Sequence, residues 1–261
     1  MVERTTPWPV GAPSWADVLV SDMERSKAFY TAVFGWEYTG GEADFGGYVT
    51  ATKDGRAVVG LAPPMEGAED QESAWTVYLA VEDSAATEQA ITEAGGVVYY
   101  PTMEVGPFGR MGIYGDPTGA AFGTWEPASH AGFGVTGEPG SMAWNEAMVG
   151  DFAAGKTFYT EVFGWTYADM SGEGMEYAIF TTPGDESGMT GGIGHDPDQE
   201  PAWTVVLEVD GTDEAVQRIK DAGGSVLVEP FDFEHGRLAL VAGPDNEPFG
   251  VITSAAPPEE N

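Results

Sequence analysis

Two carboxylates stand at the same place in a chain whose two halves repeat each other. Asp17 follows Trp15 by two residues, and Glu146 follows Trp144 by two residues. Alternate side chains of a strand point to one face, so each carboxylate would share a face with a tryptophan if these segments are strands. A carboxylate there could anchor a polar ligand or act as a base. It could equally be structural and hydrogen-bonded to backbone or water, because a buried charge needs partners in either case.

Tyrosine and arginine recur in the same way and supply further candidates. Tyr48 has its counterpart in Tyr177, and Arg110 has its counterpart in Arg237. Because a guanidinium group matches a carboxylate with two parallel hydrogen bonds, these arginines could clamp an anionic ligand. They could also form structural ion pairs with the abundant acidic side chains.

The elements that position these residues follow from the internal repeat. The segment SKAFYTAVFGW at 26–36 returns as GKTFYTEVFGW at 155–165, with eight of eleven positions identical. Further matches at nearly constant spacing extend the repeat through both halves. The Gly-rich segment between the halves lacks periodicity. We therefore predict domain 1 at 12–126, a linker at 127–140, domain 2 at 141–254 and an acidic tail at 255–261.

Each half is predicted to pass through the same elements twice. A short apolar strand at 15–20 precedes Asp22, whose carboxylate can accept the free N–H groups at the start of a helix. The helix is predicted to end at Gly35, because glycine takes the left-handed conformation at little cost. Three short strands follow, and then a second strand, a second helix and three more strands. Each half therefore holds two βαβββ units, and Asp151 and Gly164 repeat the helix ends in domain 2.

One segment of domain 2 departs from this pattern. The stretch 182–201 is long and contains Gly188, Gly191, Gly192 and Gly194. We expect a loop there, which could act as a lid or be only a solvated connection between strands.

Composition excludes several classes of partner. The net charge is −33, with 10 Lys and Arg against 43 Asp and Glu, so we expect neither nucleic acid nor an anionic membrane as a partner. The absence of cysteine excludes disulfides, thiol nucleophiles and thiolate metal sites. No stretch is long and apolar enough to cross a bilayer, and the N-terminal residues carry no apolar signal segment. We therefore expect a cytoplasmic protein.

Several motifs together indicate a family. They are the helix and its ends at 22–36, the same helix at 151–165, the triplet Ala94-Gly95-Gly96, and the turn Gly115-Asp116-Pro117-x-Gly119 before the last strand of domain 1. In these motifs the chain resembles the vicinal oxygen chelate superfamily, the glyoxalase/bleomycin resistance protein/dioxygenase group, and within it two-domain proteins of glyoxalase-like or hydroxylase-like type. The resemblance implies an α+β fold of two tandem domains. In each domain two βαβββ units would curl into a half-open barrel, with the site on its concave face.

The resemblance also implies a metal site, and this chain departs from it. Enzymes of the family bind a divalent metal through His and Glu at three positions of the concave face. Those positions fall on Trp15, Thr76 and Gly123 in domain 1 and on Trp144, Thr204 and Gly250 in domain 2. Indole donates only an N–H group and glycine has no side chain, so these residues are poor ligands. His130 lies in the linker, and His195 and His235 lie at non-equivalent places in predicted loops. We therefore expect no family-type metal centre and no cofactor.

The implied concave faces contain the remaining candidates. They are Trp15, Asp17, Tyr48, Tyr78, Arg110 and Trp125 in domain 1, and Trp144, Glu146, Tyr177, Glu208, His235 and Arg237 in domain 2. An aromatic cavity with few polar groups is the usual make-up of a small-molecule pocket. Aromatic side chains at strand spacing are equally typical of a core.

These observations favour a metal-independent protein that binds a small molecule, with one pocket per domain. A monomer would suffice for such a protein, and a homodimer is compatible with it. One alternative is an enzyme of the glyoxalase, dioxygenase or hydroxylase type that uses Asp17, Glu146, Glu208 or His235. Another is a resistance protein that sequesters an antibiotic without turnover.

Overall fold

The computed structural model describes residues 2–64, 71–172, 174–185 and 190–255. The helices are α1 (Met23–Phe34), α2 (Ser84–Glu93), α3 (Phe152–Phe163) and α4 (Thr212–Asp221), with one 3-10 turn at Ala43–Phe45. The strands before the linker are β1 (Val2–Glu3), β2 (Pro13–Leu19), β3 (Glu37–Gly40), β4 (Val49–Lys53), β5 (Arg56–Ala62), β6 (Trp75–Ala80), β7 (Val97–Val105), β8 (Gly109–Gly115) and β9 (Ala121–Pro127). The later strands are β10 (Val135–Thr136), β11 (Met142–Met148), β12 (Thr166–Asp169), β13 (Glu176–Thr181), β14 (Gly191–His195), β15 (Ala202–Glu208), β16 (Ser225–Phe233), β17 (Gly236–Ala242) and β18 (Pro248–Ser254).

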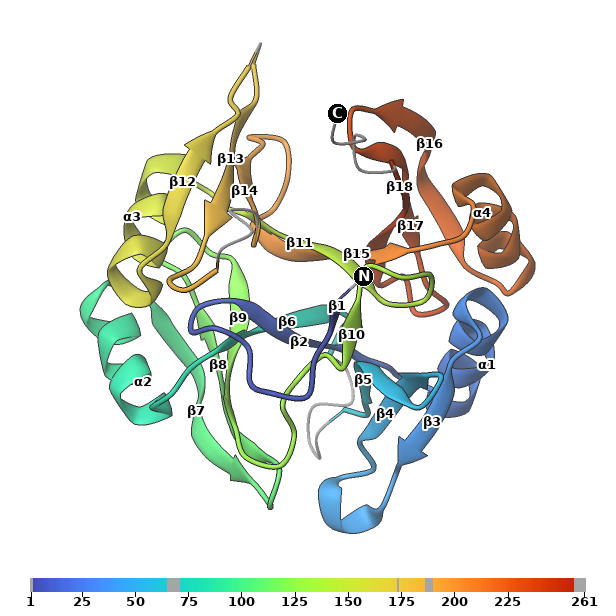
Figure 1. Cartoon of the computed structure of the whole chain (residues 1–261), viewed down its shortest axis with the longest axis horizontal. Coiled ribbons are helices and arrows are strands. Elements are labelled where there is room, and N and C mark those ends of the chain that lie inside the picture. The colour runs from blue at the N-terminus through green and yellow to red at the C-terminus, as the bar shows by residue number, and fades with distance from the viewer. Residues whose placement is uncertain (1, 65–70, 173, 186–189, 256–261) are drawn as a thin grey trace.

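Two large mixed sheets contain these strands, one built on each domain, and β1 joins the sheet of domain 2 through β10. Domain 1 forms the order β3-β4-β5-β2-β6-β9-β8-β7, and domain 2 forms the matching order β12-β13-β14-β11-β15-β18-β17-β16. The two βαβββ units of a domain join through β2 and β6, or through β11 and β15. Figure 1 shows the curved sheets facing opposite ways, with α1 beside α4 and α2 beside α3. The predicted α+β fold of two tandem domains, each built from two such units, is confirmed.

The ends of the repeated helices lie where the sequence predicts them. Asp22 accepts the backbone N–H of Arg25, and Asp151 accepts that of Ala154. Gly35 and Gly164 follow the helices with φ of 70° and 72°, the left-handed region that glycine reaches without a steric penalty.

The expectation of a loop throughout 182–201 is wrong. Gly191–His195 forms β14, which lies in the sheet between β13 and β11. The glycines have a packing reason, because a Cβ on Gly192 would lie 2.0 Å from the hydroxyl of Tyr177. Gly188, within 186–189, lies outside the described residues, as does 256–261 of the predicted tail.

The Gly-rich linker is packed rather than solvated. Phe133 and Val135 are fully buried, and β10 pairs with both β1 and β11. The backbone N–H of Phe133 donates to the carbonyl of Ser14 at 2.7 Å, so the linker lies against the start of β2.

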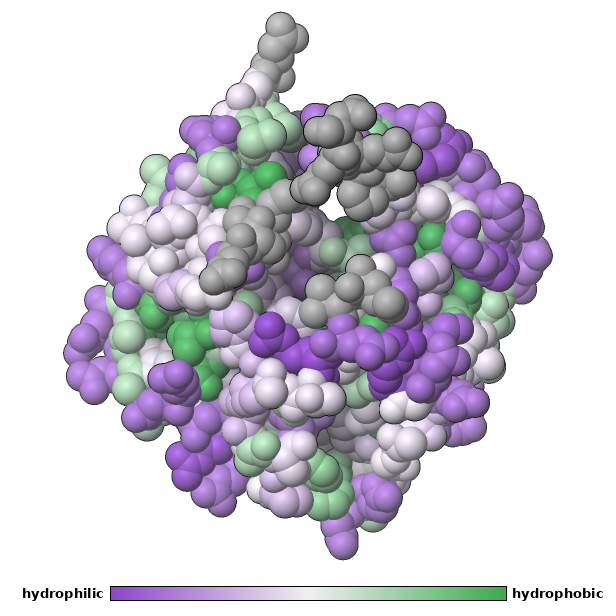
Figure 2. All heavy atoms as spheres, viewed as in Figure 1, coloured by the Kyte–Doolittle hydropathy of each residue, from purple (hydrophilic) through white to green (hydrophobic). Residues whose placement is uncertain are grey.

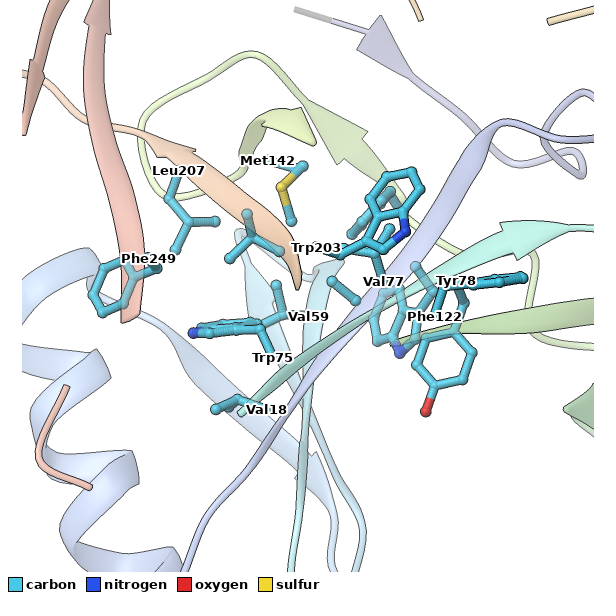
Figure 3. Close-up of a cluster of buried hydrophobic side chains, with 14 of the residues drawn as sticks. Val18, Val59, Trp75, Val77, Tyr78, Phe122, Met142, Trp203, Leu207 and Phe249 are labelled. Carbon is cyan, nitrogen blue, oxygen red and sulfur yellow. The ribbon is translucent and has the colours of Figure 1, made fainter. Parts of the chain in front are cut away.

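The helical faces of the two sheets share one core. Buried side chains from both domains form a single cluster, and Figure 3 shows Trp75 of β6 close to Phe249 of β18. The tryptophans of the repeated FGW motif bind across the domain boundary. Trp36 Nε1 donates to the carbonyl of Gly140 at 2.7 Å, and Trp165 Nε1 donates to that of Gly11 at 3.0 Å. The motif therefore holds the segments that directly precede the two domains.

The tyrosines of the repeated FY motif also reach across the boundary. Tyr159 of α3 donates to Asp116 Oδ2 at 3.1 Å and accepts the indole N–H of Trp203 at 3.0 Å. Tyr30 of α1 donates to Glu247 Oε1 at 2.7 Å. Burial raises the pKa of both hydroxyls well above the usual tyrosine range, so they stay protonated as donors.

In the view of Figure 2, hydrophilic residues gather at the outer edge of the molecule around α4. Among the described residues, no helix combines the length and the apolar character needed to cross a membrane.

The substitution Tyr159→Phe is expected to lower the free energy of unfolding by about 1–3 kcal/mol, because it leaves Asp116 and Trp203 with unpaired buried groups. Urea unfolding followed by fluorescence would measure it. Tyr167→Phe is the matched control, because that hydroxyl donates to the carbonyl of Lys156 in a half-buried position and should matter less. Equal losses in the two variants would contradict a special role for the bond between the domains.

Candidate functional site

A hydrogen-bonded cluster of aromatic side chains surrounds Asp17 on the concave face of domain 1. Trp15 and Asp17 point to this face from β2, and Tyr78 joins them from β6. Trp15 Nε1 donates to the Tyr48 hydroxyl at 2.7 Å. The hydroxyls of Tyr48 and Tyr78 both donate to Asp17 Oδ2, at 3.3 and 3.0 Å. The structure thus brings together four of the predicted residues, with three aromatic side chains around the carboxylate of the fourth.

A glycine makes room for this cluster. Gly60 of β5 lies beside Asp17, and a Cβ on it would lie 1.7 Å from the Tyr48 hydroxyl. Gly192 has the same relation to Tyr177 in domain 2. Comparing the glycines of the two halves could have found this pair in the sequence.

Domain 2 repeats the cluster in a reduced form. Trp144 Nε1 donates to the Tyr177 hydroxyl at 3.3 Å, and that hydroxyl donates to Glu146 Oε2 at 2.7 Å. The counterpart of Tyr78 is Val206, so Glu146 has one tyrosine donor where Asp17 has two. Trp144, Glu146 and Tyr177 are all half-buried, whereas Trp15 is only 3% exposed.

Burial raises the pKa of both carboxylates. It raises the pKa of Asp17 from 3.8 to about 7, and the hydrogen bonds from Tyr78 and Tyr48 oppose part of this shift. Burial likewise raises the pKa of Glu146, and the bond from Tyr177 opposes it. A carboxyl group whose pKa lies near neutrality can gain or lose a proton at ordinary pH.

The concave face of domain 2 continues into an apolar flank. Directly paired residues of neighbouring strands point to the same face, so the register places Glu146, Thr204, Val206 and Ile252 on it together with Leu238. The outermost strand adds Val228 and Phe231, each 41% exposed. Figure 2 shows this side of the molecule hollowed between the flank of β12–β14 and the flank of β16–β18. An open face therefore carries a carboxylate at its floor and apolar side chains at its edge.

The linker covers the corresponding face of domain 1. The ring of His130 lies edge-on to Trp15 at 4.4 Å, and Phe133 lies 5.6 Å from the same indole. Trp125 closes the other side, with Nε1 donating to the carbonyl of His130 at 2.9 Å. Burial lowers the pKa of His130 to about 4, so the imidazole is neutral at pH 7. The repeat gave no signal for this contact, because the linker has no counterpart within the compared halves.

Four other candidate residues either lie away from the concave clusters or have their polar groups bonded to other side chains. Arg110 pairs with Glu104, and Arg237 pairs with Asp213 and Asp232, all at the surface. Both arginines alternate with Met111 and Leu238 along their strands, so they point away from the concave faces and do not line the expected cavities.

Glu208 and His235 complete the set. Glu208 shares the concave face of domain 2, but both its oxygens accept hydrogen bonds from Ser254. His235 lies exposed in the turn between β16 and β17, beside Phe233.

Comparison with known proteins accounts for this architecture. The family model described as the glyoxalase/bleomycin resistance protein/dioxygenase superfamily matches residues 13–124 and again 141–252. The chain belongs to this superfamily. It is 34% identical to CFP32 of Mycobacterium tuberculosis, whose name associates it with the glyoxylases, over 94% of this chain and 95% of that one. It is 35% identical to the anthracycline biosynthesis protein DnrV of Streptomyces peucetius, over 93% of each chain.

Solved structures share the fold at low identity. The Mn(II)-bound glyoxalase of Novosphingobium aromaticivorans superposes with a TM-score of 0.66 at 17% identity, over 95% of this chain and 84% of that one. The 2,3-dioxygenase LapB of Pseudomonas sp. KL28 superposes with a TM-score of 0.65 at 15% identity, over 97% of each chain.

The residues at the family's metal positions do not fit a metal ion. The Trp15 indole is engaged with Tyr48, and the Tyr78 ring lies so close to Gly123 that a Cβ there would be 2.2 Å from it. Gly250 packs in the same way against Val206. Within the described ranges, no group of three or more His, Asp or Glu side chains is placed to hold an ion.

The substitution Asp17→Asn tests the raised pKa. Between about pH 4 and pH 7 the folded protein holds a proton on Asp17 that the unfolded chain has lost, so this carboxyl lowers stability as the pH rises. Asparagine can still accept from the tyrosines and does not titrate. D17N should therefore gain about 2–3 kcal/mol relative to the original protein between pH 5 and pH 8. Urea unfolding of both proteins at the two pH values measures this, and a difference independent of pH would contradict the raised pKa.

Proposed function

We propose that this protein binds a small, planar aromatic molecule on the concave face of domain 2, without the metal centre of its superfamily. The observation that carries the proposal is the half-buried cluster of Trp144, Tyr177 and Glu146 at the floor of an open face whose flank is apolar. Aromatic and aliphatic walls bind a flat molecule, and a few placed polar groups fix its orientation.

The charge of the face favours a neutral or cationic ligand. The described residues that the register places there include no lysine or arginine, and Arg237 is held in surface ion pairs behind it. An anion would meet Glu146 without a compensating cation, whereas a cation would find a carboxylate.

The relatives support an aromatic ligand. DnrV is named for anthracycline biosynthesis, and anthracyclines are polycyclic aromatic compounds. Binding without turnover would serve a protein that carries or sequesters such a compound. The proposal includes a monomeric protein in the cytoplasm, with no nucleic acid or membrane as a partner.

A second candidate is an enzyme that transfers protons. The raised pKa of Glu146, together with its hydrogen bond to Tyr177, suits a general acid or base of the glyoxalase or hydroxylase type. Consumption of a bound ligand by the original protein, lost in a Glu146→Gln variant, would favour this candidate over binding alone.

Metal content separates the proposal from the family's usual chemistry. Elemental mass spectrometry on protein purified without chelator, before and after soaking in iron, nickel, cobalt or zinc, should find no stoichiometric ion, because the six positions lack ligands. About one tightly held divalent ion per domain would overturn the metal-free part of the proposal.

Glu146→Gln tests the polar floor of the site with proflavine, a planar tricyclic cation. The substitution keeps an acceptor for Tyr177 and removes the charge, so affinity for proflavine should fall about fivefold, the equivalent of about 1 kcal/mol. Affinity for neutral 2-aminoanthracene at pH 8 should change little. Fluorescence titration at moderate salt measures both.

Glu176→Gln is the matched control, because this exposed carboxylate lies next to Tyr177 in sequence and points to the opposite face of β13. If the two variants weaken proflavine binding equally, the attraction comes from the general acidity of the protein. Failure of both dyes to bind the original protein would overturn the proposed function.

A further inference from the structure

A cavity of about 270 Å³ opens beside Trp144 on the side where β11 begins. Ala143, Trp144 and Asn145 of β11 form one wall, and Thr190 lies next to them. Trp8 of the N-terminal segment and Phe133 of the linker form the opposite wall. The cavity therefore lies between domain 2 and the two segments that flank domain 1.

Domain 1 shows what occupies the corresponding space there. The counterparts of Ala143 and Trp144 are Ser14 and Trp15. The linker lies on both, because the Phe133 N–H donates to Ser14 and the Phe133 ring packs against the Trp15 indole. In domain 1 the chain itself therefore supplies an aromatic ring and a hydrogen-bond donor in the space that corresponds to the cavity of domain 2.

We propose that the cavity beside Trp144 is a second binding site, separate from the concave face of domain 2, and that it takes an aromatic ring bearing an O–H or N–H donor. Asn145 alternates with Trp144 and Glu146 along β11, so its side chain points away from the concave face. The linker of domain 1 is the internal counterpart of the ring that this cavity takes.

The polar requirement comes from Asn145. Its Oδ1 is buried without a hydrogen-bond donor among the described residues, and the whole residue is 6% exposed. The counterpart in domain 1 is Ala16, so the acceptor is present only in the domain that has the cavity. A buried acceptor without a partner is costly, and a ligand O–H or N–H would satisfy it.

The opposite wall is held in place for such a ring. Trp8 Nε1 donates to the carbonyl of Phe133 at 3.2 Å, and the guanidinium of Arg4 lies 4.7 Å from the centre of the Trp8 ring. The volume is near the lower end for small-molecule sites, so it suits one or two fused rings rather than a whole polycyclic compound.

The test uses 2-naphthol, which carries a donor, and naphthalene, which has nearly the same shape without one. Calorimetry or ligand-observed NMR on the full chain gives both affinities. Ala143→Leu fills the cavity and should weaken 2-naphthol by about tenfold or more. Asn145→Ala, which installs the residue that domain 1 has naturally, should remove most of the preference for 2-naphthol over naphthalene. Phe45→Ala removes an exposed aromatic ring from the 3-10 turn of domain 1 and should leave 2-naphthol within about twofold of the original.

The outcomes separate this inference from the proposed function. If Ala143→Leu binds 2-naphthol like the original protein, or if 2-naphthol does not bind at all, the cavity is not the site, whereas proflavine binding that depends on Glu146 would still support the proposed function. If 2-naphthol binds without preference over naphthalene, the role of Asn145 is overturned. Circular dichroism and thermal melting check that each variant is folded.

Discussion

A carboxylate buried without a cation needs hydrogen-bond donors around it, and this chain meets that need with tyrosine. It has 43 acidic residues and only 10 Lys and Arg, so few cations are available for burial. In the described structure Tyr48 and Tyr78 donate to Asp17, Tyr177 donates to Glu146, Tyr159 donates to Asp116, and Tyr30 donates to Glu247. The first two carboxylates build the concave faces and the last two join the domains, so the same interaction shapes both the sites and the interface.

The two domains share the same residue cluster on the concave face but differ in what covers that face. Both place a tryptophan, a tyrosine and a carboxylate at corresponding positions, with a glycine that admits the tyrosine hydroxyl. The linker can cover only one of the two faces, because it leaves β9 of domain 1 and runs directly over Trp15. The half-exposed cluster around Glu146 is the consequence, and it explains why the binding proposal concerns domain 2.

The fold could be predicted from the sequence because its signals are local. Asp22 and Gly35 mark the ends of a helix through backbone chemistry alone. Asp151 and Gly164 repeat these signals, so the helix of the second domain could be predicted in the same way. β14 was missed because its glycines look like a loop when the strand partner is unknown. This strand has glycine at position 192 because the Tyr177 hydroxyl occupies the space that a side chain would need. Such a tertiary contact cannot be predicted from the local sequence pattern.

The candidate site was predictable where strand alternation could be followed from the repeated residues, and this includes Tyr78 although domain 2 has Val206 in its place. Alternation along β2 and β11 identified Trp15, Asp17, Trp144 and Glu146, and the same alternation, traced across β8 and β17, turns Arg110 and Arg237 away from the site. His130 and Phe133 could not be found in this way, since a comparison of two repeats sees nothing in the segment between them. Yet those two residues make the two domains different. The rings of His130 and Phe133 cover the concave face of domain 1, whereas the concave face of domain 2 stays open for the aromatic ring of a ligand.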